Sequence, residues 1–105
     1  MRESIITDYM EYCMICGKPC EERHHGLSGT ANRCLSDQYL IILPLCRYHH
    51  NSSKMSVHHN REMEVLSKQL SQLAFEKEHY RKMLYDGEDD PAREVFRAKF
   101  GKSFL

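Results

Sequence analysis

The feature that most constrains this chain is the spacing of its cysteines and histidines. Cys13 and Cys16 are separated by two residues, and Cys46 and His49 repeat that spacing further along. Two thiolates three positions apart chelate one ion where the chain turns tightly, and Gly17 permits the positive φ angle that such a turn needs. Cys46 and His49 would face the same way at the start of a helix. We therefore predict that these four residues hold a structural zinc ion, rather than that the cysteines are buried free thiols.

The length of the chain favours such a metal site. A single domain of 105 residues has little room for a large core, and a metal would stabilise it. Five cysteines is an odd number, and in a reducing compartment close pairs are better explained as metal ligands than as disulfides. Cys20 and Cys34 fall outside the paired spacing, and we expect them to bind no metal.

Hydropathy and charge narrow the range of partners. No apolar run approaches the ~18 residues of a membrane span, and the N-terminus lacks the apolar core of a signal peptide, so we expect a cytoplasmic protein without a membrane partner. Fifteen basic and fifteen acidic residues cancel, with six of each sign in residues 1–60 and nine of each in residues 61–105. No basic stripe of the kind that dominates non-specific nucleic-acid binding is present. Contacts to DNA would have to come from locally placed side chains: Arg23, Arg33, Arg47, Lys54 and Arg61.

The N-terminal part of the chain predicts a small hairpin. Residues 21–26 form its first strand, a polar loop containing glycines follows through Asp37, and residues 38–45 form a second, almost wholly apolar strand. Pro44 fits near the end of that strand, where one ladder hydrogen bond can be lost. A short helix is expected to open near Cys46.

The C-terminal part predicts two helices. Asn60 is a good N-cap for a long helix over residues 61–84. Asp90 as cap and Pro91 as first residue predict a last helix over 91–100, which Gly101 ends. Side chains on and after this helix are expected to pack it back onto the fold: Val95, Phe96, Phe100, Phe104 and Leu105.

One stripe of the long helix is apolar. Its members recur at steps of three, four or seven residues: Met63, Leu66, Leu70, Leu73 and Tyr80. We expect this stripe to pack into the core. The alternative is a short antiparallel helix pair, in which the 61–84 helix forms a homodimer.

Six histidines remain outside the zinc site, and His24, His25 and His50 are the first candidates for a second site. His50 is turned by about 100° from His49 on a helix, so it would serve a second site rather than the same ion. His24 and His25 would point to opposite faces of a regular strand and can share a site only where the strand ends, which Gly26 favours. One imidazole could then bind a metal while its neighbour takes a proton from water. The alternative is that one histidine caps the hairpin and the other is solvated.

These motifs together resemble a known family. Cys13-x2-Cys16, His24-His25 and Leu43-Pro44-Leu45-Cys46-x2-His49-His50 are similar to the HNH endonucleases, the ββα-metal nucleases, in their zinc-stapled form. The wider chain is similar to small phage-encoded HNH-like proteins in the loop from Gly29 to Arg33 and the terminus from Phe100 to Leu105. The resemblance implies an α+β domain with a zinc-stapled ββα-metal module in residues 1–60 and a helical extension in residues 61–105.

The resemblance also implies an activity. Such a protein would hydrolyse DNA phosphodiester bonds with a divalent ion such as Mg, Mn or Ni, in the host cytoplasm if phage-encoded. His24 and His50 would hold the ion, and His25 would be the general base that activates water.

The chain departs from the family pattern at two places. The family's middle asparagine falls where this chain has Leu40 or Ile41, and Asn32 in the loop is a substitute or simply a turn residue. One turn after His50 stands Lys54, which offers a phosphate contact, and His58 reaches the ion only if residues 51–56 bend the chain back. The rival interpretation is therefore a catalytically inactive zinc module that binds DNA or a protein partner.

Overall fold

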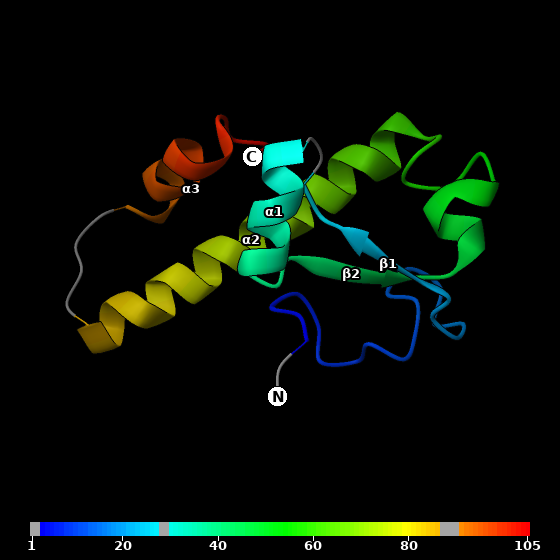
Figure 1. The fold of residues 1–105 in the computed structure, drawn as a ribbon, viewed down its shortest axis with the longest axis horizontal. Helices are drawn as coiled ribbons and strands as arrows, with labels where there is room; N and C mark the ends of the chain where they lie inside the picture. Colours follow the sequence, from blue (N-terminus) through cyan, green and yellow to red (C-terminus); the bar gives the residue numbers. More distant parts are fainter. Residues whose placement is uncertain (1–2, 28–29, 87–90) are drawn as a thin grey trace.

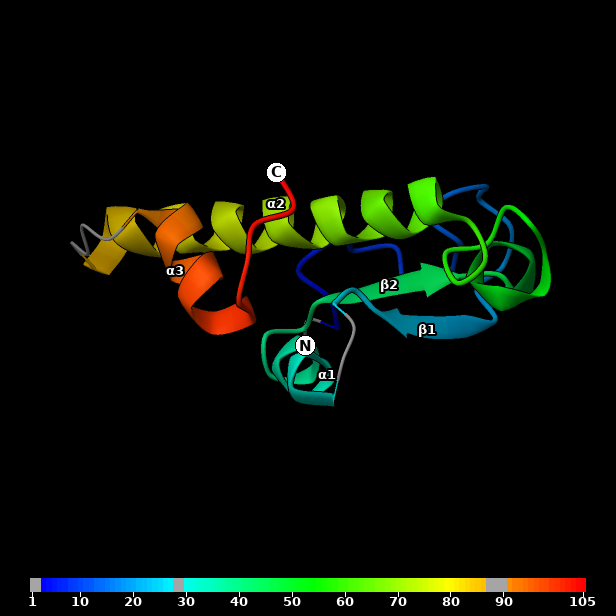
Figure 2. The ribbon, with the colours of Figure 1, turned by 90° about the horizontal axis from the view of Figure 1, so that it is seen from above.

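The predicted α+β class is confirmed in a computed structural model, which describes residues 3–27, 30–86 and 91–105. A two-stranded sheet and a π-helical turn lie at one end of a long helix, and two shorter helices pack beside it (Figures 1 and 2). No helix in the described ranges is both long and apolar enough to cross a membrane. The elements in order are β1 (Glu22–His25), α1 (Thr30–Gln38), β2 (Ile42–Leu45), η1 (Tyr48–Ser52), α2 (Arg61–Asp86) and α3 (Ala92–Phe100).

The two strands form the predicted antiparallel hairpin, with His24 opposite Leu43 and His25 opposite Ile42. All four residues of β2 are buried, which explains its continuous apolar sequence. The strand is shorter than the predicted 38–45, because Leu40 adopts a positive φ of 58° that breaks the extended backbone.

Helix α1 corrects the prediction of a polar loop between the strands. The glycines before it and the short polar residues within it suggested turns, but Leu35 and Tyr39 are four residues apart and both pack on the second core cluster described below. Ser36 is buried between them and its hydroxyl donates to the Leu27 carbonyl at 3.5 Å. Tertiary packing of this one face outweighs the weak helix propensity of the segment.

The core consists of two clusters of buried side chains. The first surrounds the cysteine knuckle and comprises Cys13, Leu43, Leu45, Cys46 and Val57. The second lies where α2 and α3 meet and comprises Leu27, Ile41, Phe75, Phe96 and Phe100. Strand β2 contributes Leu43 and Leu45 to the first cluster, and Ile41, just before the strand, belongs to the second. This segment therefore links the cysteine knuckle to the helical part of the domain.

The ends of the long and the C-terminal helices follow the predicted signals. The Asn60 side-chain oxygen accepts from the Met63 N–H at 3.1 Å, which makes Asn60 the N-cap of α2. Gly101 ends α3 with a φ of 95°, and its N–H donates to the Arg97 carbonyl at 2.8 Å. Pro91 immediately precedes α3 instead of being its first residue, and the predicted Asp90 cap lies outside the described residues.

The prediction that the apolar stripe of α2 packs in the core is wrong for most of its length. Met63 packs against the first cluster, but Leu66, Leu73 and Tyr80 are exposed. The buried face of α2 carries one aromatic side chain, Phe75, and otherwise small or polar ones, namely Ser67, Ser71, Gln72 and Glu76. Polar groups are tolerated there because they are hydrogen-bonded. Gln72, for instance, donates to Glu76 and Ser103 and accepts from the Phe104 N–H.

Small side chains are required where β1 runs into α2. A Cβ atom on Gly26 would overlap the Ser71 hydroxyl and lie 2.8 Å from Ile41 Cγ2. We expect Gly26→Ala to lower the free energy of unfolding in urea by about 1–3 kcal/mol, because the helix must move away from the strand. Combining it with Ser71→Gly should cost less than the sum of the two single changes. An additive result would show that the close approach does not limit the packing.

Candidate functional site

The first candidate site is built by a tight turn at the N-terminus and by the end of β2. The Gly17 N–H donates to the Cys13 carbonyl at 2.8 Å and Gly17 adopts the expected positive φ of 78°. This turn places the thiols of Cys13 and Cys16 on one side. Cys46 follows β2 directly, and His49 lies in η1, where its N–H donates to the Cys46 carbonyl at 3.2 Å.

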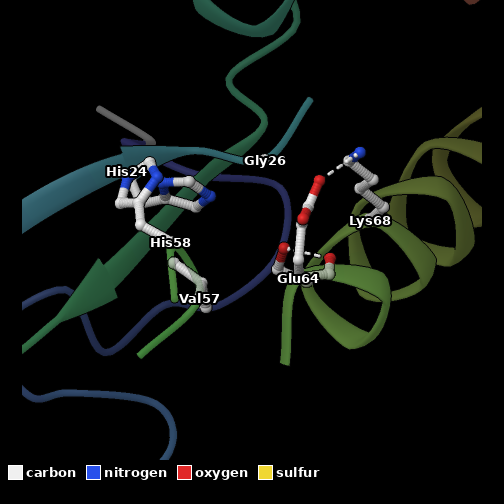
Figure 3. A pocket seen from close by; sticks show the side chains of 7 residues that line it. His24, Gly26, Val57, His58, Glu64 and Lys68 are labelled. Atoms are coloured by element: carbon white, nitrogen blue, oxygen red, sulfur yellow. Dashed lines mark hydrogen bonds and ion pairs between the residues drawn. The ribbon is translucent and has the colours of Figure 1, made fainter. Parts of the chain in front are cut away.

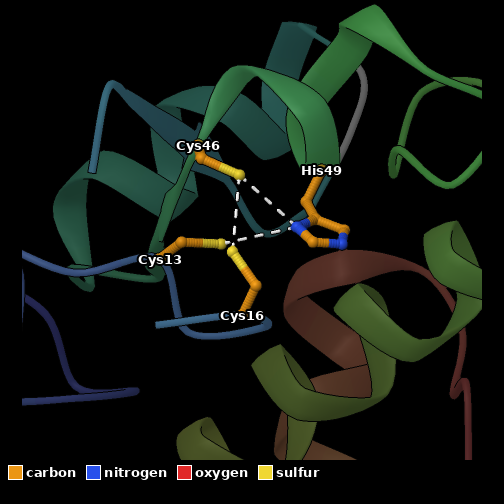
Figure 4. A group of neighbouring side chains, drawn as sticks. All are labelled: Cys13, Cys16, Cys46 and His49. Carbon is orange, nitrogen blue, oxygen red and sulfur yellow. Dashed lines mark hydrogen bonds between the residues drawn. The ribbon is translucent and has the colours of Figure 1, made fainter. Parts of the chain in front are cut away.

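The ligand atoms of these four residues converge on one point (Figure 4). Cys16 Sγ and Cys46 Sγ are 3.7 Å apart, and His49 Nδ1 lies 3.4 Å from Cys46 Sγ and 3.9 Å from Cys13 Sγ. Ligands on a tetrahedral zinc ion, with bonds of about 2.3 Å to sulfur and 2.0–2.1 Å to nitrogen, are separated by about 3.8 Å for S···S and 3.5 Å for S···N. The cluster could therefore hold a structural metal such as zinc.

The surroundings of the knuckle favour the thiolate form of Cys13. Burial would raise the pKa of this thiol, but backbone hydrogen bonds at Cys46, Cys16 and Ile15 outweigh burial, so the pKa of Cys13 is lowered. For Cys46 burial prevails, and its pKa is raised. The first sulfur is thus stabilised as an anion by the peptide backbone, and a bound cation would supply the charge that the second needs.

A sharp reversal after η1 creates the second candidate site. The Val57 N–H donates to the His49 carbonyl at 2.8 Å, and the His58 N–H donates to the His50 carbonyl at 3.2 Å. Serine hydroxyls hold the reversal, since Ser53 donates to the Tyr48 carbonyl and Ser56 to the Ser53 carbonyl. The chain therefore bends back as required for His58 to join His50.

His24, His50 and His58 form a compact group of three imidazoles. His24 lies on β1, and its ring is 5.3 Å from the His50 ring and 5.1 Å from the His58 ring, measured between centroids. The Nε2 atoms of His50 and His58 are 3.1 Å apart. Two imidazole nitrogens on one ion lie about 3.0–3.4 Å apart, depending on the coordination geometry. The group could hold a metal ion.

The protonation of these rings suits metal binding. Burial, and then the proximity of His50 and His58, lowers the pKa of His24 to about 3. Burial and His50 also lower the pKa of His58. His50 Nδ1–H donates to Glu22 Oε2 at 2.9 Å, which orients the ring with its Nε2 toward the other two histidines. The lowered pKa values of His24 and His58 favour the neutral imidazoles that bind metals.

His25 is oriented by a different carboxylate. Its Nε2–H donates to Asp37 Oδ1 at 2.8 Å, near the end of α1. The other ring nitrogen, Nδ1, then carries a lone pair and can accept a proton. His25 is the last residue of β1, and at this strand end both His24 and His25 line one pocket.

This pocket has a volume of about 440 Å³, and the three-histidine group forms one of its walls. The other lining residues are Arg23, His25, Leu27 and Arg33. A smaller pocket of about 130 Å³ lies on the α2 side of His24 and His58, where Lys68 donates to Glu64 at 2.7 Å (Figure 3). The histidine group thus separates two hollows, and the larger one is rimmed by arginines.

The five predicted DNA-contact residues are not gathered at one place. Arg23 and Arg33 line the larger pocket, whereas Arg47, Lys54 and Arg61 do not. Arg23 is 3.0 Å from Glu3, and Arg47 is within 4 Å of Glu21 and Glu22. Within the described ranges, Arg33 is therefore the pocket arginine that has no carboxylate partner.

Asn32 does not take the place of the family asparagine. It lies in α1, outside the lining of both pockets, and no hydrogen bond joins it to His25 among the described residues. Asp37 holds the ring instead. Leu40 and Ile41, at the expected asparagine position, are half-buried and buried apolar residues.

The two carboxylates, Glu22 and Asp37, are the site residues that sequence reasoning missed. Glu22 was detectable, because it stands two residues before His24 and so shares one face of a strand with it. Asp37 was not, because its position depends on α1, which the sequence did not predict.

No protein family, curated protein or solved structure matches this chain.

Proposed function

We propose that this chain is a metal-dependent endonuclease of the HNH type that hydrolyses DNA phosphodiester bonds. One observation carries the proposal: a three-histidine group suited to a metal and a carboxylate-oriented histidine with a free ring nitrogen line the same pocket. In this proposal the cluster of Cys13, Cys16, Cys46 and His49 binds zinc and stabilises the fold.

The donor set suggests which ions would bind. Three neutral imidazoles favour transition metals such as nickel, whereas magnesium prefers oxygen ligands. A divalent ion held by His24, His50 and His58 would stabilise negative charge on the phosphate and on the leaving oxygen.

The protein's own groups perform the proton transfer. His25 Nδ1 takes a proton from a water molecule while Nε2–H remains bonded to Asp37, whose negative charge stabilises the resulting imidazolium. The water oxygen bonds to phosphorus, the bond from phosphorus to the leaving sugar oxygen breaks, and solvent protonates that oxygen. Arg33 is positioned to pair with a neighbouring phosphate at the pocket rim.

The test is cleavage of supercoiled plasmid by the purified chain. We expect nicked and linear products with Ni²⁺ or Mn²⁺, weaker cleavage with Mg²⁺ and none with excess EDTA. Intact plasmid with all three ions would contradict the proposal.

The second candidate function is a zinc module that binds DNA or a protein without cutting. It is favoured by the balanced charge of the chain, and by the lack of an asparagine among the described residues that line the pocket with His25. Counting metals separates the two candidates. An endonuclease should retain one zinc per chain through dialysis and bind a second ion on titration, whereas the binding module should take up only the first.

A further inference from the structure

The outer surface of α2 exposes three large side chains of its predicted apolar stripe, among charged residues. Leu66, Leu73 and Tyr80 are 42%, 52% and 54% exposed. They follow one another at intervals of seven residues, which is almost two full helical turns, so they lie on one stripe. In the part of the chain that the structure describes, α3, the sheet and α1 lie on one side of α2 (Figure 2), and buried Phe75 of α2 packs against Phe96 of α3.

The spacing along this stripe is that of a seam between two helices. Alternating steps of three and four residues run through Met63, Leu66, Leu70, Leu73, Lys77 and Tyr80. The stripe covers 18 residues, or roughly 27 Å of helix. A surface helix that packs against nothing has no need of an apolar stripe with this length and heptad spacing. A helix that pairs with another helix does need one.

We propose that the stripe is a homodimer interface in which α2 of a second copy packs antiparallel. The charges on α2 favour a second copy of this helix as the partner, and they favour the antiparallel direction. On the outer face of α2, Glu62 lies near the N-terminal end, and Lys77 and Arg81 lie near the C-terminal end. Arg81 is only loosely held by Glu78, at 3.9 Å on the surface. In an antiparallel pair the acidic end of each copy meets the basic end of the other, whereas a parallel pair would align like charges.

Maximum overlap fixes the register. Leu66 faces Lys77 of the second copy, half-buried Leu70 faces Leu73, and the part of Met63 left uncovered by the first core cluster faces Tyr80, with each contact repeated by the two-fold axis. The Lys77 chain covers Leu66 with its methylenes while its ammonium reaches toward Glu62. The interface uses none of the metal-site histidines, so it stands or falls independently of the nuclease proposal.

Sedimentation of the full chain at several concentrations tests the dimer. We expect wild type to shift from monomer to dimer with concentration. Leu73→Lys should weaken association by at least about 30-fold, because it places two lysines beside the two-fold axis. Leu73 is half-exposed in the monomer, so the helical circular dichroism should not change. Val65→Lys is the matched control, since Val65 is also exposed but lies off the stripe. A monomeric wild type, or equal effects of the two substitutions, would overturn the proposal.

A charge exchange tests the direction of the pair. Lys77→Glu should weaken the dimer, because the new carboxylate lies near Glu62 of the other copy. Adding Glu62→Lys to that variant should restore association, because the opposite charges face each other again. In a parallel pair the exchange would restore nothing, and that result would overturn the antiparallel arrangement.

Discussion

Replacing Cys16 with alanine should unfold the domain at 25 °C, although the side chain is exposed. Cys16 is exposed and contributes little to the apolar core, and its sulfur lies 3.7 Å from Cys46 Sγ within the candidate ligand group. If the four ligands hold zinc, losing one removes much of a binding free energy that is about 10–16 kcal/mol in small zinc domains. The entire stability of a domain this size is about 5–15 kcal/mol. We therefore expect loss of zinc and of cooperative thermal unfolding together.

Cys34→Ala is the matched control for this prediction. Cys34 is also an exposed cysteine, and it lies on α1 away from the cluster. The variant should keep one zinc per chain and melt like wild type, and chelation of wild type should reproduce the Cys16→Ala phenotype. If Cys16→Ala stayed folded with a full zinc complement, the assignment of this ligand set would be wrong.

The parts of the site that sequence analysis located are those fixed by local geometry. The spacing within each Cys/His pair, the positive φ of Gly17 and the Asn60 cap depend only on neighbouring residues. The joining of Cys13 to Cys46 is a long-range contact, but metal chemistry restricts the partners because so few residue types can serve as ligands.

The parts that sequence analysis did not locate depend on packing across the chain. Helix α1 exists because Leu35 and, just after the helix, Tyr39 pack half-buried against the second core cluster, where the Tyr39 ring contacts Phe75 of α2 and Phe100 of α3. No local signal in the sequence reveals these partners. The placement of Asp37 beside His25 follows from this helix.

The orientation of helix α2 also depends on packing across the chain and could not be predicted from the sequence. Periodicity identified its apolar stripe correctly but could not say which face turns inward. The inward face is set by the close approach of Gly26 to Ser71 and by the glutamines that bind the C-terminal segment. The apolar stripe was consequently left on the surface, where we propose that a second copy covers it.

Replacing His25 with alanine should reduce plasmid cleavage by about 10²–10⁴-fold, the range expected when a general base is lost. His25 is not among the three histidines that group around a potential metal, so the variant should bind both ions as wild type does. That combination, intact metal content with lost cleavage, distinguishes a base from a ligand. His58→Ala should instead lose the second ion together with the activity.

Two further variants, Asp37→Asn and His59→Ala, test the orientation of His25 and the specificity of the histidine effects. The Asp37 carboxylate accepts a hydrogen bond from the His25 ring and is not among the candidate metal ligands, so the amide of Asp37→Asn should lower kcat by about 10–100-fold while leaving KM and metal content nearly unchanged. His59 is exposed and lines neither pocket, so removing this imidazole should leave cleavage as it was. Cleavage by His25→Ala at the wild-type rate would exclude His25 as the base. A fall in both kcat and metal content for Asp37→Asn would mean that Asp37 supports the metal rather than the proton transfer.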